Sequence, residues 1–128
     1  MKRLVVDLDG TLTLDQAEIG YEHKLPNLPV IAKVREYKAA GFEIIVASSR
    51  NMRTYDSSIG KINALTLPII IAWLQQHEVP YDEIHVGKPW CGFDGFYVDD
   101  KAVRPSEFHS KSYDEIRELL ERERNLTR

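Results

Sequence analysis

Two aspartates two positions apart are the side chains of this sequence best suited to chemistry. Asp7 and Asp9 directly follow the apolar residues 4–6, and Gly10 comes next. Carboxylates can act as nucleophiles, as general acids and bases, and as ligands for hard cations such as Mg²⁺. Taken alone, however, the residues Asp-Leu-Asp-Gly fit an acidic turn after a strand equally well.

Polar side chains also end three further apolar segments, namely residues 43–47 before Ser48, residues 83–86 before Lys88, and residues 95–98 before Asp99 and Asp100. Because ligands bind at the carboxyl ends of parallel strands, we expect these side chains to gather at one edge of a sheet. Four carboxylates gathered there would repel each other by roughly 4 kcal/mol for each pair at about 4 Å. Lys88 and a divalent cation would offset that repulsion, and protonation of one acid is the alternative. An all-oxygen ligand set favours Mg²⁺ over zinc.

Helical patterns separate the apolar segments. Proline in the first turn predicts helix starts at residues 27–29 and 66–68, and Gly41 is expected to end the first of these helices. Ser112 and Glu115 form the pattern of a capping box for a last helix. Strands that alternate with helices predict an α/β fold with a mainly parallel sheet.

Length and composition indicate one domain over residues 1–128. The 20 acidic and 17 basic side chains give a net charge of −3, which disfavours a dedicated nucleic-acid binder. Cys91 is the only cysteine, so no internal disulfide can form. No apolar run approaches the roughly 20 residues of a membrane span, and no secretory signal is recognisable. We therefore expect a cytoplasmic protein with no membrane partner.

The acidic and basic residues lie in an order that resembles a known family. Residues 7–13, Asp-Leu-Asp-Gly-Thr-Leu-Thr, resemble motif I of the haloacid dehalogenase (HAD) superfamily. Ser48 is similar to the Ser/Thr of motif II, Lys88 to the lysine of motif III, and Asp99-Asp100 to the acids of motif IV. The resemblance implies a three-layer Rossmann-like fold. Few residues separate these motifs, so it implies a minimal cap over the site.

The resemblance also implies a phosphatase mechanism. Asp7 would attack phosphorus and form an aspartyl-phosphate, while Asp9 would protonate the leaving group and then activate water. Ser48 and Lys88 would bind the transferred phosphoryl group. The ligands of the Mg²⁺ cofactor would be the carboxylate of Asp7, the backbone carbonyl of Asp9, and Asp99 or Asp100. An acid at position 9 favours phosphoryl transfer over carbon–halogen cleavage, because a halide leaves without a proton.

Three strings, residues 49–55, 87–90 and 97–105, are similar to the small HAD phosphatases of bacterial capsule polysaccharide biosynthesis. This similarity implies a small phosphorylated substrate, a sugar or polyol phosphate. Ser49, Arg50 and Asn51 follow motif II and are expected to bind it, with the Arg50 fork suited to a carboxylate or second phosphate. The alternatives are a 3′-phosphatase on nucleic acid ends and a non-catalytic module that binds phosphate or metal.

With so small a cap, the sequence does not determine what covers the site. Residues 10–28 are polar and irregular, and they lie where relatives place a mobile flap. Either the site admits a large or polymeric substrate, or a neighbouring subunit of a homo-oligomer acts as the lid.

Overall fold

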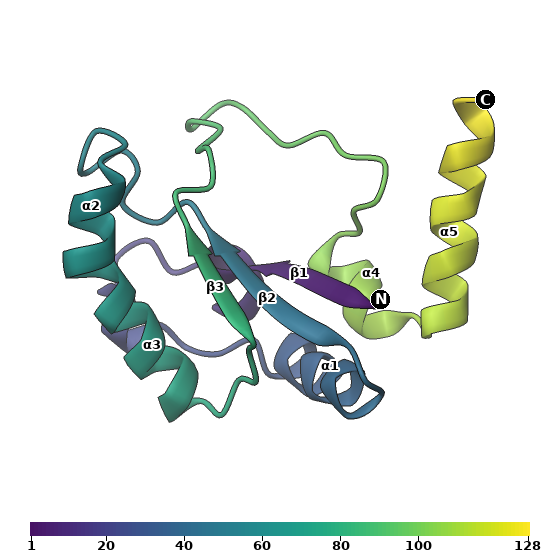
Figure 1. The fold of residues 1–128 in the computed structure, drawn as a ribbon, viewed down its shortest axis with the longest axis horizontal. Helices are drawn as coiled ribbons and strands as arrows, with labels where there is room; N and C mark the ends of the chain where they lie inside the picture. The colour runs from purple at the N-terminus through teal and green to yellow at the C-terminus, as the bar shows by residue number, and fades with distance from the viewer. The chain divides into compact units, whose positions relative to one another are not determined.

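The computed structural model describes residues 1–128 and contains a three-stranded parallel sheet (Figure 1). The strands lie side by side in the order β1 (Arg3–Asp7), β2 (Glu43–Ser48) and β3 (Glu83–Val86). The register places Asp7 opposite Ala47 and Ser48 opposite Val86, so the three strands end at the same edge. These are the first three apolar segments of the sequence, and the predicted α/β class with a mainly parallel sheet is confirmed.

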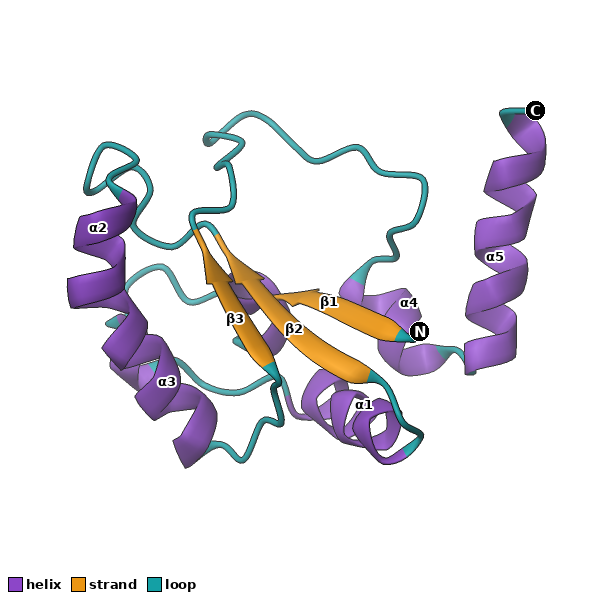
Figure 2. Cartoon of the chain, in the orientation of Figure 1, coloured by secondary structure: helices purple, strands orange, loops and turns teal.

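Helical crossovers connect the strands (Figure 2). The first is α1 (Leu28–Ala39); the second begins at α2 (Ile59–Lys61) and continues through a π-helical turn (Ile62–Thr66) into α3 (Leu67–Gln76). Pro29 and Pro68 stand in the first turns of α1 and α3, which confirms both predicted helix starts. Right-handed crossovers that advance in one direction place their helices on the same face of a sheet.

The hydrophobic core follows from this arrangement. It consists mainly of side chains that alternate along the strands and repeat along the helices: Val6, Ile44, Val46, Val30, Ile31, Val34, Ile70, Trp73 and Leu74. Full burial of each such side chain stabilises the fold by roughly 1.5–3 kcal/mol. On the alternate positions Val5 remains 62% exposed although its neighbour Ile45 is buried, so most of the core lies on one face of the sheet.

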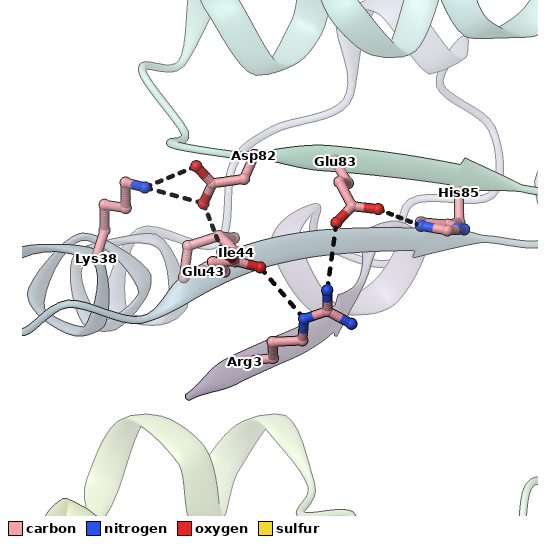
Figure 3. Close-up of polar contacts among 7 residues, drawn as sticks. All are labelled: Arg3, Lys38, Glu43, Ile44, Asp82, Glu83 and His85. Carbon is pink, nitrogen blue, oxygen red and sulfur yellow. Dashed lines mark hydrogen bonds and ion pairs between the residues drawn. The ribbon is translucent and has the colours of Figure 1, made fainter. Parts of the chain in front are cut away.

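Near the beginning of the strands, charged side chains occupy the positions that alternate with the core residues (Figure 3). Arg3 lies between two glutamates, with Nε 3.2 Å from a carboxylate oxygen of Glu43 and Nη2 3.9 Å from one of Glu83. Glu83 in turn lies 3.0 Å from the ring of His85. These pairs cross the sheet from β1 to β3.

The chain divides into two compact units, Met1–Trp90 and Cys91–Arg128. In the second unit, irregular residues lead to α4 (Pro105–Ser110) and α5 (Tyr113–Leu126). Ser112 caps α5: its Oγ accepts the Glu115 N–H at 3.2 Å, while its own N–H donates to the Glu115 carboxylate at 2.8 Å. The predicted capping box is thereby confirmed, whereas one domain over residues 1–128 stays a prediction.

The prediction of a fourth strand over residues 95–98 is wrong. The structure has no regular secondary structure there, and Phe96 and Val98 are 80% and 87% exposed. A strand needs a neighbouring strand that pairs with its N–H and C=O groups. Residues 95–98 pair with no strand of the sheet. Among the helices, none combines the length and the hydropathy that crossing a bilayer requires.

Candidate active site

The carboxyl edge of the sheet brings together side chains from β1, β2 and the segment after β3. Asp7 is the last residue of β1, and Ser48 is the last residue of β2. The backbone N–H of Lys88 donates to the carbonyl of Ser48 at 3.1 Å, which extends the ladder beyond β3. The Lys88 Nζ then lies 3.5 Å from Oδ1 of Asp7. A nucleophile candidate and a cation therefore face each other at this edge.

A tight turn over Leu8–Leu12 presents the two aspartates. Gly10 has a φ of 77°, in the left-handed region that glycine adopts at little cost. The Thr13 N–H closes the turn on the Leu8 carbonyl at 3.0 Å, and the Gly10 N–H donates to the Thr13 hydroxyl at 3.2 Å. Leu8, Leu12 and Thr13 are fully buried. The turn is thus fixed from the core, which holds the backbone of Asp9 in place.

The environment of Asp7 disfavours its charged form. Burial raises the pKa of Asp7 and nearby Asp9 adds to the rise, whereas Lys88 and the backbone N–H of Leu8 act in the opposite direction. The Thr11 hydroxyl is a distant donor, 3.5 Å from Oδ2. The side chain nevertheless remains 35% exposed and so accessible to a ligand. A nucleophilic carboxylate must be ionised, and Lys88 is the charge that favours this state.

Asp9 is held quite differently, by a two-point contact with Arg50. Its two carboxylate oxygens accept from Nε at 3.0 Å and from Nη2 at 2.8 Å. The side chain of Arg50 is only 1% exposed. Arg50 is predicted to contact the substrate at the mouth of the site, but the structure buries it, because its fork is matched to the Asp9 carboxylate. The guanidinium would have to become exposed before a substrate could reach it.

The neighbours of Arg50 are engaged in local structure. Ser48 is 2% exposed, and its Oγ accepts the Arg50 N–H at 3.0 Å, so its own hydroxyl proton is left for another acceptor. Asn51, at a φ of 63°, accepts from the Thr66 hydroxyl at 2.7 Å and donates to Thr54 at 3.2 Å. The half-buried Ser49 accepts a backbone hydrogen bond at its carbonyl. Substrate binding by Ser49 and Asn51 stays a prediction.

The structure also answers the charge argument for a metal ion. The two site acids of the first unit each face a base, Asp7 with Lys88 and Asp9 with Arg50, and these pairs offset part of the repulsion. Neither unit contains a group of three or more His, Cys, Asp or Glu side chains arranged to hold an ion. The oxygen chemistry at Asp7 still fits Mg²⁺, because burial keeps its carboxylate under-compensated and a hard cation would relieve it.

The motif IV acids lie in the second unit. The Oδ1 of Asp99 accepts the Lys101 N–H at 2.8 Å. Asp99 and Asp100 line a groove of about 360 Å³ that also includes Leu119 and Leu120 of α5. Their role as metal ligands therefore stays a prediction.

Tyr21, in the irregular 10–28 segment, is a further neighbour of the site. Its ring centroid lies 4.1 Å from the guanidinium carbon of Arg50. Partial burial and the charge of Asp9 raise the pKa of Tyr21, and Arg50 acts in the opposite direction. The sequence shows only that an aromatic residue lies in the loop after the acidic motif. Its contact with Arg50 cannot be inferred from the spacing of the two residues.

Comparisons with known proteins identify similar structures. No family model and no curated protein sequence matches this chain. A crystal structure of a structural-genomics target from Vibrio cholerae has 60% identity, covers 96% of this chain and 99% of that one, and has a TM-score of 0.92. A chain of the Pnkp1/Rnl/Hen1 complex has 26% identity over 66% of this chain, with a TM-score of 0.52. This chain spans only 27% of that one.

Two lower similarities were also found. A second structure, described as the Pnkp1/Rnl/Hen1 RNA repair complex, has 23% identity over 66% of this chain and 25% of that one, with a TM-score of 0.50. The D,D-heptose 1.7-bisphosphate phosphatase from B. bronchiseptica, complexed with magnesium and phosphate, has 17% identity over 75% of this chain and 54% of that one, with a TM-score of 0.48.

The fold agrees with the order of the sequence motifs. An acid pair follows β1, a serine ends β2 and a lysine follows β3, all at one edge of a parallel sheet. The chains of the repair complex share this fold over two thirds of the present chain. Since it is 60% identical to the Vibrio cholerae protein over nearly all of both chains, this chain belongs to the same family as that protein, and its fold is a Rossmann-like α/β fold with a parallel sheet.

Proposed function

We propose that this chain is a phosphomonoester hydrolase that acts through Asp7 and uses Mg²⁺. The observation that carries the proposal is the Asp7–Lys88 pair, 3.5 Å apart at the carboxyl edge of the sheet, with the second carboxylate of Asp9 two residues away. A partly buried carboxylate that faces one lysine and has a raised pKa is poor at stabilising a fold. It is well suited to attack an electrophile that brings its own negative charge to Lys88.

The reaction would take place in two displacements. An oxygen of Asp7 attacks phosphorus in line; the bond from phosphorus to the substrate oxygen breaks, and Asp9 gives that oxygen a proton. In the second step Asp9 takes a proton from water, whose oxygen attacks the aspartyl-phosphate and releases inorganic phosphate and free Asp7. Arg50 occupies one lone pair on each oxygen of Asp9, so each oxygen keeps a second lone pair for the transferred proton.

The other site residues would stabilise the phosphoryl group. Lys88 neutralises charge on its oxygens, and the Ser48 hydroxyl, which keeps its proton, donates to one of them. The Asp7 carboxylate and the Asp9 carbonyl are the first-unit groups proposed to hold Mg²⁺, which when bound adds positive charge opposite the phosphate. A ligand role for Asp99 or Asp100 rests on the motif IV resemblance alone.

For the substrate, we propose a sugar or polyol phosphate of capsule or surface polysaccharide biosynthesis. The support is the similarity of residues 49–55, 87–90 and 97–105 to the small capsule-related phosphatases. No domain is inserted between β1 and β2, where only the turn, a loop and α1 occur. This absence is compatible with an open site or with a cover supplied by a second subunit.

A second candidate substrate is a phosphorylated RNA end. The similarity to a chain of an RNA repair complex, at 26% identity in one structure, favours it. The net charge of −3 counts against it, because nucleic-acid binders usually carry a basic surface.

Phosphate release from a panel tests the proposal and separates the substrates. The panel contains sugar phosphates, polyol phosphates and 3′-phosphorylated oligonucleotides, with Mg²⁺ or with a chelator, for the wild type and for Asp7→Asn. Turnover that is lost in chelator and in Asp7→Asn supports the hydrolase, and the preferred substrate identifies the class. If folded, Mg²⁺-supplied protein turns over no member of the panel, the proposal fails and a non-catalytic phosphate- or metal-binding module is favoured.

A further inference from the structure

The loop between the acidic turn and α1, residues 13–26, is closed on itself and fixed to the core. Thr13 and Pro26 form a β-bridge, and the Leu14 N–H donates to the Leu25 carbonyl at 2.9 Å. The indole N–H of Trp73, a residue of α3 that is 1% exposed, donates to the Lys24 carbonyl at 2.8 Å. The loop base is therefore held at two places, although most of its residues are exposed.

Near its middle, this 13–26 loop places an aromatic ring on a buried cation. The Tyr21 ring lies 4.1 Å from the guanidinium carbon of Arg50, and Lys24 Nζ lies 5.2 Å from the same ring. Desolvated cation–π contacts of this kind are the stronger ones. The ring comes from the loop and the cation from the segment after β2, so the contact joins two separate parts of the site.

The guanidinium has few other attachments. Two of its nitrogens bind Asp9, whereas the third, Nη1, is buried and has no hydrogen-bond partner. A buried donor without a partner is unfavourable, and it shows that the position of Arg50 is not set by satisfying every N–H. The contacts that the structure gives its guanidinium are the Asp9 carboxylate and the Tyr21 ring.

We propose that Tyr21 and Arg50 are positioning residues that hold the Asp9 carboxylate in one orientation and couple it to the 13–26 loop. The kinetic consequence rests on the proposed function, whereas the coupling rests on the geometry alone. Two parallel hydrogen bonds from a planar fork fix both the place and the plane of a carboxylate. Tyr21 keeps water from the fork, which strengthens those bonds.

Substitutions separate the ring, the fork and the loop. Tyr21→Ala removes the ring, whereas Tyr21→Phe keeps it. Arg50→Lys keeps the charge but replaces the fork by a single point of contact. Glu22→Ala is the matched control, because Glu22 is the next residue of the same turn, is exposed and pairs only with His23 at 3.8 Å.

The first readout needs no activity. In the wild type the Arg50 Nε–H, bound to Asp9 and shielded from water, should give a slowly exchanging proton–nitrogen NMR resonance. We expect Tyr21→Ala to speed its solvent exchange at least tenfold, roughly what loss of 1.4 kcal/mol of protection implies. Tyr21→Phe and Glu22→Ala should leave the exchange slow. Fast exchange already in the wild type, or unchanged exchange in Tyr21→Ala, would overturn the coupling.

The second readout is kinetic. On the best substrate of the panel, we expect Tyr21→Ala to lower kcat by about tenfold and Arg50→Lys by about a hundredfold, because misplacing a reacting group by about 1 Å can have an effect of that size. KM should change little, Tyr21→Phe should restore most of kcat, and thermal unfolding identifies any merely misfolded variant. A rise in KM at unchanged kcat would overturn the positioning role. If the wild type hydrolyses nothing, the proposed function fails, and NMR exchange alone decides the coupling.

Discussion

Two aspartates at opposite ends of the sheet have opposite electrostatic environments. Asp82, just before β3, accepts hydrogen bonds from Lys38 at 2.8 and 2.9 Å and from the Ile44 N–H at 2.8 Å (Figure 3). These hydrogen bonds lower the pKa of Asp82. Asp7, at the end of β1, faces Lys88 at 3.5 Å, and burial raises its pKa. Both acids have a lysine partner and a backbone N–H donor, and their side chains are similarly exposed, at 35% and 34%. The difference lies in the distance to the lysine, in the charge of Asp9 beside Asp7 and in the loss of solvation around Asp7.

The two ends of the sheet differ in how closely they bind an ionised carboxylate. At the amino end of the sheet the ionised form of Asp82 is bound closely, and two elements, α1 and β2, are tied together by it. At the carboxyl end the ionised form of Asp7 is left short of partners. On the proposed function, a phosphate ester brings its charge to Lys88, whereas Asp82 is already bound by Lys38 and by the Ile44 N–H. The two sites should therefore respond in opposite ways to removal of their charge.

The largest expected effect is that of Asp7→Asn, which should abolish phosphate release while it stabilises the fold. A raised pKa means that the native state binds the Asp7 proton more tightly than the unfolded chain does. As pH rises from the ordinary pKa of an aspartate through the raised pKa of Asp7, ionisation of Asp7 lowers the free energy of unfolding. Asparagine does not titrate, so the advantage of the variant should be absent at low pH and complete above the raised pKa.

Urea unfolding of both proteins from pH 3 to pH 8, in chelator, measures this difference. Asp9→Asn serves as the comparison, because it breaks the bidentate pair with Arg50 and should destabilise. If Asp7→Asn is less stable than the wild type at pH 7, the contrast between the two ends of the sheet does not hold.

Lys88→Met ranks second and should lower turnover by about a hundredfold or more. It removes the charge that favours ionised Asp7 and would neutralise the phosphoryl group, and loss of a single transition-state donor typically has an effect of this size. The pH at which activity appears should also rise, because the charge of Lys88 lowers the pKa of Asp7 more than any other group does. Rate–pH profiles of the variant and the wild type measure both effects, and identical profiles would exclude this role for Lys88.

The third prediction concerns Ser48→Ala, with an expected tenfold fall in kcat or about 1.4 kcal/mol in the transition state. The alanine variant removes the hydroxyl proton that we assign to the phosphoryl group, and it also leaves the Arg50 N–H without its acceptor. Ser48→Thr retains the hydroxyl and is the matched control. Equal kcat for Ser48→Ala and the wild type would show that the hydroxyl serves only the backbone.

Local signals account for what the sequence predicts well. Apolar runs over single strands, a proline in the first turn of α1 and α3, and the Ser112–Glu115 box each depend on residues within a few positions of one another. α4 was not predicted, although Pro105 stands in its first turn and Glu107 occupies the capping-box position. The Arg104 N–H donates to the Glu107 carboxylate at 2.9 Å. Sequence patterns thus identify most helices and strands of this chain.

Contacts between distant residues account for the rest. Whether residues 95–98 form a strand depends on a neighbour that no local pattern specifies, and the apolar composition alone predicts the wrong state. The partner of Arg50 is Asp9, 41 residues earlier, and its cover is Tyr21, which only the turn over Leu8–Leu12 and the closed loop bring near. The sequence predicts that Asp7, Ser48 and Lys88 share one edge, because the carboxyl ends of parallel strands lie together. It does not predict which of the side chains at that edge pair with one another.

The smallest expected effect is that of Asp82→Asn, which should leave turnover unchanged and lower stability only where the carboxylate is ionised. Asparagine keeps an oxygen for the Ile44 N–H but removes the charge that Lys38 binds. Because the native pKa of Asp82 is lowered, the wild type has this contribution above the ordinary pKa and loses it as pH falls through the lowered value. Urea midpoints of the two proteins should therefore differ at pH 7 and converge near pH 3, the reverse of the trend for Asp7→Asn. Lys38→Met, which removes the other partner, should give the same convergence, and a difference that persists at low pH would point to altered packing instead of charge.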